Sequence, residues 1–224
     1  MKKLKYIGAY FSPLLALLSF QLQGFGAFLC VVTLYIVVPV SEQFLPQDTY
    51  NLSKSEKELA KDDPFYDWIL YLLVPLHLFV IYTFLIKISS PEIQLMETIA
   101  YTMTIGTILG VNGINGGHEL GHKTNEPAKL ICAHILLATS LQNHFMTYHN
   151  SGHHRDVATP NDLTTAKKGQ SFYHFALQSQ IGGYFKTWKL EREKLLRQGK
   201  SNFLNPMIIL TIIPRSLQAF IFIY

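Results

Sequence analysis

Two short stretches of the chain concentrate histidine at spacings that suit metal binding. In the first, "HELGH", three residues separate His118 from His122. In the second, "HNSGHH", the same spacing separates His149 from His153, and His154 follows directly. Residues i and i+4 of an α-helix lie on one face, about 6 Å apart along the helix axis. Each stretch, if helical, therefore presents two imidazoles side by side.

The number and type of these side chains indicate what they would hold. Five of the chain's nine histidines fall in the two stretches, whereas a catalytic zinc ion takes only three protein ligands and keeps an open position. Five imidazoles near one point therefore predict two metal ions, or a histidine set that continues elsewhere in the chain. Ligation by nitrogen alone favours iron, copper or zinc over magnesium or calcium.

The first stretch has two other interpretations. "HELGH" also satisfies the H-E-x-x-H pattern of zinc proteases, in which Glu119 would be the general base. That pattern is short and arises by chance, and two histidines capping a helix at the membrane interface would also produce it. Zinc hydrolysis and a structural role therefore stay open on the first stretch alone, and the second stretch favours the larger metal centre.

The segments that must position these histidines are strongly apolar. Four blocks, 6–19, 25–40, 68–86 and 93–111, contain at most one histidine or charged side chain each. About 20 helical residues cross a bilayer, so these blocks predict an integral membrane protein. The basic start "MKKLKY" resembles a signal peptide, but a second apolar block begins directly after "QLQG". That short gap favours a hairpin of two spans turning near Gly24.

The positions of lysine and arginine predict the orientation in the membrane. Cations precede the first block, separate the second from the third, and gather in 123–200, whereas the loops 21–24 and 89–91 contain none. Because cytoplasmic loops carry the excess of such residues, we expect the N-terminus and the histidine region 112–200 on the cytoplasmic side. The formal charge of +4 reflects this bias, and no nucleic-acid partner is indicated.

The region 112–200 is polar overall and contains shorter apolar runs. These runs suit helices packed at the cytoplasmic mouth of the bundle. Its last part, 186–200, predicts a basic amphipathic helix that stops at Gly199. This helix suits the docking of an acidic electron carrier or contact with anionic lipid head groups. Cys30 and Cys132 lie in apolar surroundings and predict neither a disulfide nor a zinc site.

The two histidine stretches also carry a family resemblance. "NGGHELGHK", followed about 25 residues later by "HNSGHHRDVATPND", resembles the integral-membrane non-haem di-iron alkane monooxygenases of the fatty-acid-desaturase-like superfamily. Three residues between the first two histidines of the second box are typical of alkane and xylene monooxygenases, whereas desaturases usually have two. "HRDVATP" is the most specific feature. The resemblance covers the entire chain, from four spans before the first box to "WKLEREKLLRQGKS" after the second.

The resemblance implies an all-α, polytopic membrane helix bundle of about six spans, of which four to five are present, with a cytoplasmic helical histidine-box region. It implies O₂-dependent terminal hydroxylation of medium-chain n-alkanes to 1-alkanols, in the inner (cytoplasmic) membrane, at a centre of two iron ions. Electrons would come from NAD(P)H through rubredoxin reductase and rubredoxin. The iron ligands would be the five box histidines, His118, His122, His149, His153 and His154.

The chain departs from the family pattern in two places. The family usually has glutamate before the first histidine of the second box, where this chain has Tyr148. It also tends to "EDPAS" where this chain has "NDLTT". A missing carboxylate beside a ligand could weaken the support of that imidazole.

Several other side chains are weaker candidates. Glu119 and Asp156 would orient ligand imidazoles through their second nitrogen atoms, or serve as surface and cap residues. His144 resembles a family position before the second box, although a structural hydrogen bond is favoured over ligation. Tyr35 could form the floor of a substrate tunnel, or pack against another span. The remaining candidates, one turn residue and three structural histidines, are Asp162, His77, His134 and His174.

The end of the chain sets one further expectation. A single membrane-embedded domain would hold four spans in 1–111, the histidine boxes in 112–200 and the start of a fifth span in 203–224. The residues after Arg215 are too few to cross a bilayer, and the carboxylate of Tyr224 would lie at bilayer depth. Because the family places further histidine ligands after its last spans, we expect a C-terminally truncated chain with impaired activity. A membrane zinc metalloprotease and an inactive metal-binding remnant are the alternatives.

Overall fold

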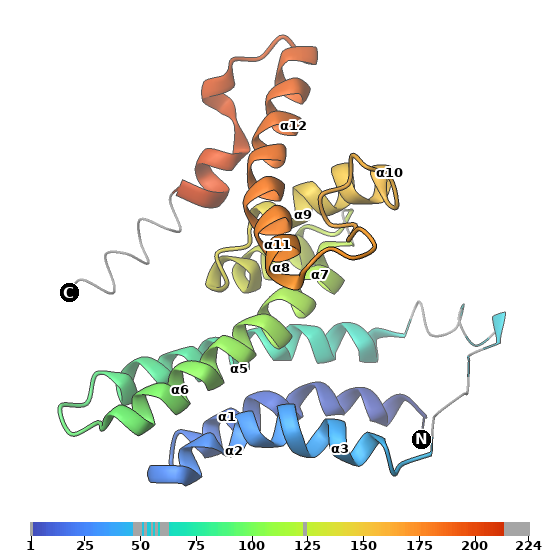
Figure 1. Ribbon diagram of the computed structural model, residues 1–224. Coiled ribbons are helices and arrows are strands. Elements are labelled where there is room, and N and C mark those ends of the chain that lie inside the picture. Colours follow the sequence, from blue (N-terminus) through green and yellow to red (C-terminus); the bar gives the residue numbers. More distant parts are fainter. Residues whose placement is uncertain are drawn as a thin grey trace. The chain divides into compact units, whose positions relative to one another are not determined.

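The computed structural model describes residues 2–46, 51, 53, 54, 56, 58, 63–122 and 125–212. These residues form helices joined by turns and loops, with no β-strand among them, which confirms the predicted all-α fold (Figure 1). The chain divides into two compact units, Met1–Leu120 and Gly121–Tyr224.

The first two apolar blocks form a helical hairpin in the first unit. Its first arm consists of the 3₁₀ helix η1 (Lys2–Tyr10) and helix α1 (Phe11–Ser19). Gly24 has a φ of +55°, in the left-handed region that glycine adopts without strain, so the hairpin turns where the sequence predicts. The second arm then runs through η2 (Gly24–Phe28), α2 (Leu29–Val32), the π-helix η3 (Thr33–Val37) and α3 (Val38–Glu42).

The third and fourth apolar blocks form two long helical segments. Helix α5 (Pro64–Ile88) begins after Asp63, whose carboxylate accepts a hydrogen bond from the backbone N–H of Phe65. The fourth block is one continuous segment made of α6 (Leu95–Ile108), the π-helix η4 (Leu109–Ile114) and α7 (Asn115–Gly121). Its far end carries the first histidine stretch.

The core of the first unit joins these segments through apolar packing and hydrogen bonds. The ring of Phe20 meets the ring of Tyr101 edge-on, with centroids 5.3 Å apart. The Tyr101 hydroxyl donates to the carbonyl of Leu22 at 2.7 Å, and the Ser12 hydroxyl donates to Oδ1 of Asn112 at 2.9 Å. These contacts fix the segment that leads to the histidines against the hairpin.

Among the described residues, two segments are long and apolar enough to cross a membrane, namely Gly24–Glu42 and Pro64–Ile88. Segments 2–19 and 95–121 are helical as predicted, but the first contains three lysines and the second mixes glycine and threonine among its apolar residues. Large apolar side chains lie on the surface, including Trp68, which is 62 % exposed. Such a surface suits lipid contact, and the unit is a membrane helix bundle.

The second unit consists of shorter helices. Helix α8 (Pro127–Thr139) is followed by one helical segment made of α9 (His144–Tyr148), the π-helix η5 (His149–His153) and α10 (His154–Asp156). A further segment is made of α11 (Phe172–Leu177), the π-helix η6 (Gln178–Gly182) and α12 (Gly183–Arg197). Helix α12 packs against α9 and η5, so the second histidine stretch is supported from one side by the basic helix.

The predicted basic helix forms the last part of α12. It ends at Arg197, and Gly199 has a φ of +65°, as expected for a glycine that stops a helix. Beyond it lie η7 (Asn202–Leu204) and the π-helix η8 (Ile208–Ile212).

Some sequence-based expectations fall outside the described residues. The rest of the fifth apolar run is among them, with Pro214, Arg215 and Tyr224. Part of the charge pattern is also among them, namely Lys57, Lys61 and Lys123. Both cysteines are described, and both are free thiols, with Cys30 buried and Cys132 half-buried.

Candidate metal centre

The first histidine stretch lies at the end of the helical segment that runs from α6 through α7. His118 is on α7, and His122 directly follows Gly121, the last residue of that helix. The division between the two units falls inside α7, so helix geometry alone keeps His118 about one turn before His122. Gly121 permits close packing in the second unit, because a Cβ here would overlap the side chain of Met146 in α9.

The second histidine stretch forms a π-helix rather than the expected α-helix. The predicted i, i+4 pair is present, since the rings of His149 and His153 stack with centroids 5.3 Å apart. Hydrogen bonds in a π-helix run from i to i+5, and this wider turn brings His154 still closer. Nε2 of His149 and Nε2 of His154 lie 2.8 Å apart. The adjacent histidine therefore takes the position nearest to His149.

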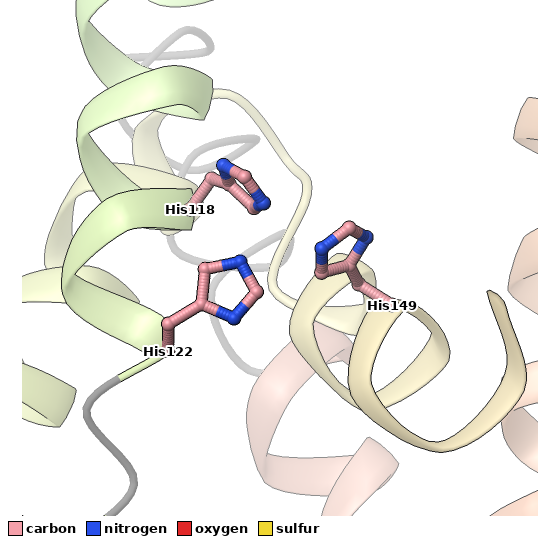
Figure 2. A group of neighbouring side chains, drawn as sticks. All are labelled: His118, His122 and His149. Atoms are coloured by element: carbon pink, nitrogen blue, oxygen red, sulfur yellow. The ribbon is translucent and has the colours of Figure 1, made fainter. Parts of the chain in front are cut away.

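Imidazoles of both stretches converge. Ligand atoms of His118, His122 and His149 lie within 4.8 Å of one another, and the three rings point toward one another (Figure 2). Within the second unit, the ring of His122 lies 5.1 Å from that of His149 and 5.4 Å from that of His154. Four of the five predicted ligands thus form one cluster, and His153 stacks beside it.

A buried carboxylate holds His153. Nδ1 of His153 lies 2.8 Å from Oδ2 of Asp162, which is only 2 % exposed. Burial raises the pKa of Asp162, but hydrogen bonds from Thr165, Thr164 and His153 outweigh it and hold that pKa well below its usual range. Asp162 is therefore an anionic acceptor. An anionic acceptor favours the tautomer of His153 that has its proton on Nδ1, which leaves Nε2 for a metal ion.

This role of Asp162 goes beyond the turn predicted from the sequence. The turn exists, since the backbone N–H of Thr165 donates to the carbonyl of Asp162 at 3.3 Å. The carboxylate, however, points inward to the histidine. The available signal in the sequence was the pair of hydroxyl donors, Thr164 and Thr165, which follow Asp162 closely enough to satisfy a buried carboxylate.

The two acidic residues predicted to orient ligands differ in their surroundings. Oε1 of Glu119 lies 3.4 Å from Nδ1 of His118, while the Glu119 side chain is 64 % exposed. Asp156 instead contacts Arg155 at 2.8 Å and Lys186 at 3.1 Å. Hydrogen bonds from these two cations hold the pKa of Asp156 well below its usual range. Asp156 therefore pairs with two basic side chains and not with a ligand imidazole. Glu119 does lie beside a predicted ligand, but its carboxylate is exposed to solvent.

The remaining candidates occupy structural positions or the surface. His144 is buried, and its ring meets that of Tyr184 edge-on at 5.3 Å. Tyr35 is 62 % exposed, and its hydroxyl oxygen accepts a hydrogen bond from Thr107 at 3.4 Å. Three other histidines lie outside the boxes. His77 is fully buried, Nδ1 of His134 lies 3.3 Å from an asparagine oxygen, and His174 is exposed.

The basic face of α12 borders two cavities that share Arg155. One cavity of about 320 Å³ is also lined by Lys194, Arg197 and Glu191, and the other, of about 400 Å³, by Lys186, Lys189 and Glu193, so cations outnumber carboxylates in both. Cation-lined hollows of this kind attract anionic groups. They lie on the second unit, on the same helix that supports the π-helical histidines.

Comparison with known families agrees with the histidine pattern. The profile of the family described as fatty acid desaturase matches residues 96–223, which include both histidine stretches and more than half of the chain. The chain belongs to the fatty acid desaturase family. The predicted superfamily is thereby confirmed.

Curated relatives of this family member carry names that match the predicted resemblance. The chain is 35% identical over 198 residues to "Alkane 1-monooxygenase 1" of Alcanivorax borkumensis, covering 86% of the chain and 48% of the relative. It is 31% identical over 217 residues to "Alkane 1-monooxygenase" of Pseudomonas putida, covering 93% and 54%. It is 31% identical over 210 residues to "Alkane 1-monooxygenase" of Ectopseudomonas oleovorans, covering 90% and 52%. The chain spans about half the length of these relatives.

The histidine cluster fits a metal ion of the kind that imidazole prefers. Its donors are nitrogen atoms, which suit iron and other first-row transition metals. Nε2 of His149 and Nε2 of His154 lie 2.8 Å apart. At this distance the two nitrogens share a proton through a hydrogen bond, and a metal ion can replace that proton. The carboxylate behind His153 adds the outer support that metal-bound imidazoles commonly have.

Proposed function

We propose that this chain belongs to an enzyme that hydroxylates medium-chain n-alkanes at the terminal carbon, using O₂ and histidine-bound iron. The observation that carries the proposal is the convergence of box histidines, with ligand atoms of His118, His122 and His149 within 4.8 Å of one another. Relatives named alkane 1-monooxygenase, at 31–35% identity over most of the chain, support the substrate and the reaction.

The chemistry of the substrate supports a metal-based oxidant. An alkane C–H bond is strong and unpolarised, so it offers nothing to a general base or a nucleophile. Iron, when bound, would supply the activation of O₂, and the protein would supply ligation, exclusion of water and aim. We propose two iron ions, with His118, His122, His149, His153 and His154 among their ligands.

His153 has a defined part in this scheme. With its Nδ1 proton held by Asp162 at 2.8 Å, it presents Nε2 and does not change tautomer as a metal ion binds. The exposed Glu119 carboxylate near His118 would orient that ligand more loosely. Asp162 and Glu119 would both act on the imidazoles and not on the substrate.

The membrane provides the route for the substrate. An alkane partitions into lipid, and the first unit presents apolar side chains on its surface, so delivery from the bilayer suits the proposal. We propose the inner (cytoplasmic) membrane, with the N-terminus and the histidine region on the cytoplasmic side. The lysines of 2–5 and the cations of 123–200 support this orientation.

Electrons would then arrive from the cytoplasm. We propose rubredoxin as the donor, reduced by an NAD(P)H-dependent rubredoxin reductase, with α12 as its docking surface. Lys189, Arg192 and Lys194 are exposed on that helix and suit an acidic carrier. Lys186 is a poorer docking residue, because its amine contacts Asp156 at 3.1 Å and its side chain is 20 % exposed.

The test is an isotope experiment on the purified chain in lipid nanodiscs loaded with iron. With n-octane, NADH, reductase, rubredoxin and ¹⁸O₂, we expect detectable 1-octanol that contains ¹⁸O, at the impaired level expected from the sequence, and no product from the His149→Ala variant. Alkanol without ¹⁸O, or equal product from both proteins, would overturn the proposal. Bound zinc together with peptide cleavage would instead favour a metalloprotease.

A further inference from the structure

Tyr148 occupies the position directly before the π-helical histidines and is almost fully buried. It is the last residue of α9 and is 3 % exposed. Its hydroxyl donates to Oδ1 of Asp162 at 3.0 Å and accepts from the backbone N–H of Leu163 at 2.9 Å. One hydroxyl group therefore bonds both the side chain of Asp162 and the backbone that follows it.

The ring of Tyr148 is held in a seat made by two glycines. A Cβ on Gly152 would lie 2.7 Å from the ring, and a Cβ on Gly183 would lie 3.8 Å from its other edge. The amine of Lys186 lies 5.6 Å from the ring centroid. Because backbone approaches the ring so closely at Gly152, the ring cannot shift toward the histidine helix, and the hydroxyl keeps its position.

Asp162 receives donors on both carboxylate oxygens. Oδ1 accepts from the Tyr148 hydroxyl, from the Thr164 backbone N–H at 3.0 Å and from the Thr164 hydroxyl at 2.8 Å. Oδ2 accepts from the Thr165 hydroxyl and from Nδ1 of His153 at 2.8 Å. The donors on Oδ1 set the rotation of the carboxylate, which in turn aims Oδ2 at the histidine.

The loop that carries Asp162 is also tied to α12. The amine of Lys186 donates to Oδ2 of Asp156 at 3.1 Å and to the carbonyl of Asn161. Both ends of the segment 156–161 are therefore bound by one side chain that also faces the Tyr148 ring. The carboxylate, the phenol and the lysine form a single connected support behind His153.

From this geometry we propose that Tyr148 is a positioning residue for the metal ligand His153. It acts through Asp162, by holding the carboxylate in the rotation that keeps the His153 proton on Nδ1 and Nε2 toward the metal. The inference rests on the proposed metal centre, because positioning matters only if His153 binds metal. The ligand chemistry is that of a neutral imidazole with a charge-assisted hydrogen bond to its second nitrogen.

Loss of the Tyr148 hydroxyl would act in two ways. The half-buried N–H of Leu163 would lose its acceptor, and Oδ1 of Asp162 would lose one of three donors. Asp162 could then turn away from His153, and the imidazole could bind with altered geometry. Removing an outer-shell partner of a metal-bound histidine commonly lowers metal affinity by about 10–100-fold.

The experiment compares Tyr148→Phe with the wild-type chain and with Tyr173→Phe, whose tyrosine is 80 % exposed in α11. Each protein is loaded with ⁵⁷Fe in nanodiscs, and iron loss to a ferrous chelator is followed alongside the Mössbauer spectrum. We expect Tyr148→Phe to weaken iron binding at least about tenfold and to change the quadrupole splitting of part of the iron. Tyr173→Phe should match the wild type in both measurements.

A second variant guards against misfolding of the first. Thr165→Val removes another donor to Asp162 without touching the ring seat, and should shift the same Mössbauer signal to a smaller extent. Wild-type affinity and spectrum in both variants would overturn the positioning role while leaving the metal centre intact. A wild-type chain that binds no iron would instead remove the proposed function itself.

Discussion

The two histidine-bearing segments present the same H-x-x-x-H spacing by different structural means. The end of α7 is a regular helix, and one helical turn is enough to relate His118 to His122. The segment η5 is a π-helix, in which His153 is held from behind by a buried carboxylate. One pair of ligands is positioned by the backbone, and the other segment relies on a side-chain network.

This difference predicts unequal sensitivity to substitution. Backbone geometry survives the loss of a neighbouring polar side chain, whereas a buried hydrogen-bond network loses order when one member is removed. Changes around η5 should therefore disturb metal binding more than comparable changes around α7.

Replacing His149 with alanine should have the largest effect. His149 lies 5.1 Å by ring centroid from His122 and 4.3 Å from His154, so its loss removes the ligand that faces both stretches. We expect the chain to insert in the membrane and retain almost no iron, measured by metal analysis after gel filtration. His174→Ala, at an exposed position in α11, is the control and should keep wild-type iron. Full iron occupancy in His149→Ala would contradict the assignment of this ligand.

Replacing Gly152 with alanine should damage the π-helical segment next most strongly. The new Cβ would lie 2.7 Å from two ring carbons of Tyr148 and 3.4 Å from Leu190, so the buried ring must move. Overpacking of this kind destabilises by about 1–3 kcal/mol, and we expect both a lower thermal unfolding temperature and weaker iron binding. The matched control is Gly110→Ala in η4, where nothing lies within 4 Å of the added Cβ. Equal unfolding temperatures for the two variants would refute the tight seat.

The sequence predicted the frame of the molecule better than the details of the site. Apolar blocks mark the four helical segments of the first unit because a helix satisfies its backbone hydrogen bonds within one contiguous stretch of chain. The turn at Gly24 and the stop at Gly199 also follow from local rules, since both glycines have positive φ. Such features depend on neighbours in the chain and can be read from it.

The support behind His153 depends on contacts across the chain. Tyr148 stands where the family pattern has glutamate, and Asp162 was predicted only as a turn residue, yet their side chains bond each other at 3.0 Å. Local rules assigned Asp162 to a turn, which is correct for its backbone and incomplete for its carboxylate. Likewise, the π-helical turn that brings His154 to His149 packs against α12 and has no signature in the spacing of the histidines.

Reversing charge on α12 should have a moderate effect that does not involve iron binding. Arg192→Glu together with Lys194→Glu removes exposed cations from the proposed docking face. We expect rubredoxin to be oxidised about tenfold more slowly at low ionic strength, with less salt dependence, in stopped-flow measurements on iron-loaded protein. The control reverses the exposed pair Lys167 and Lys168 in the preceding loop. Unchanged rates in the α12 variant would favour contact with lipid head groups instead.

Glu119→Gln should have the smallest effect, and it tests the backbone-positioned side of the comparison. The carboxylate lies 3.4 Å from Nδ1 of His118 but is 64 % exposed, so water can replace its contact, and exposed pairs contribute little. Because one helical turn already relates His118 to His122, we expect iron affinity to fall by less than about threefold. Asp162→Asn is the matched change behind His153, and there the loss should reach about 10–100-fold. Equal losses in the two variants would show that α7 depends on its carboxylate as much as η5 does. A zinc-dependent peptidase activity abolished by Glu119→Gln would assign this residue as a general base and replace the oxygenase proposal.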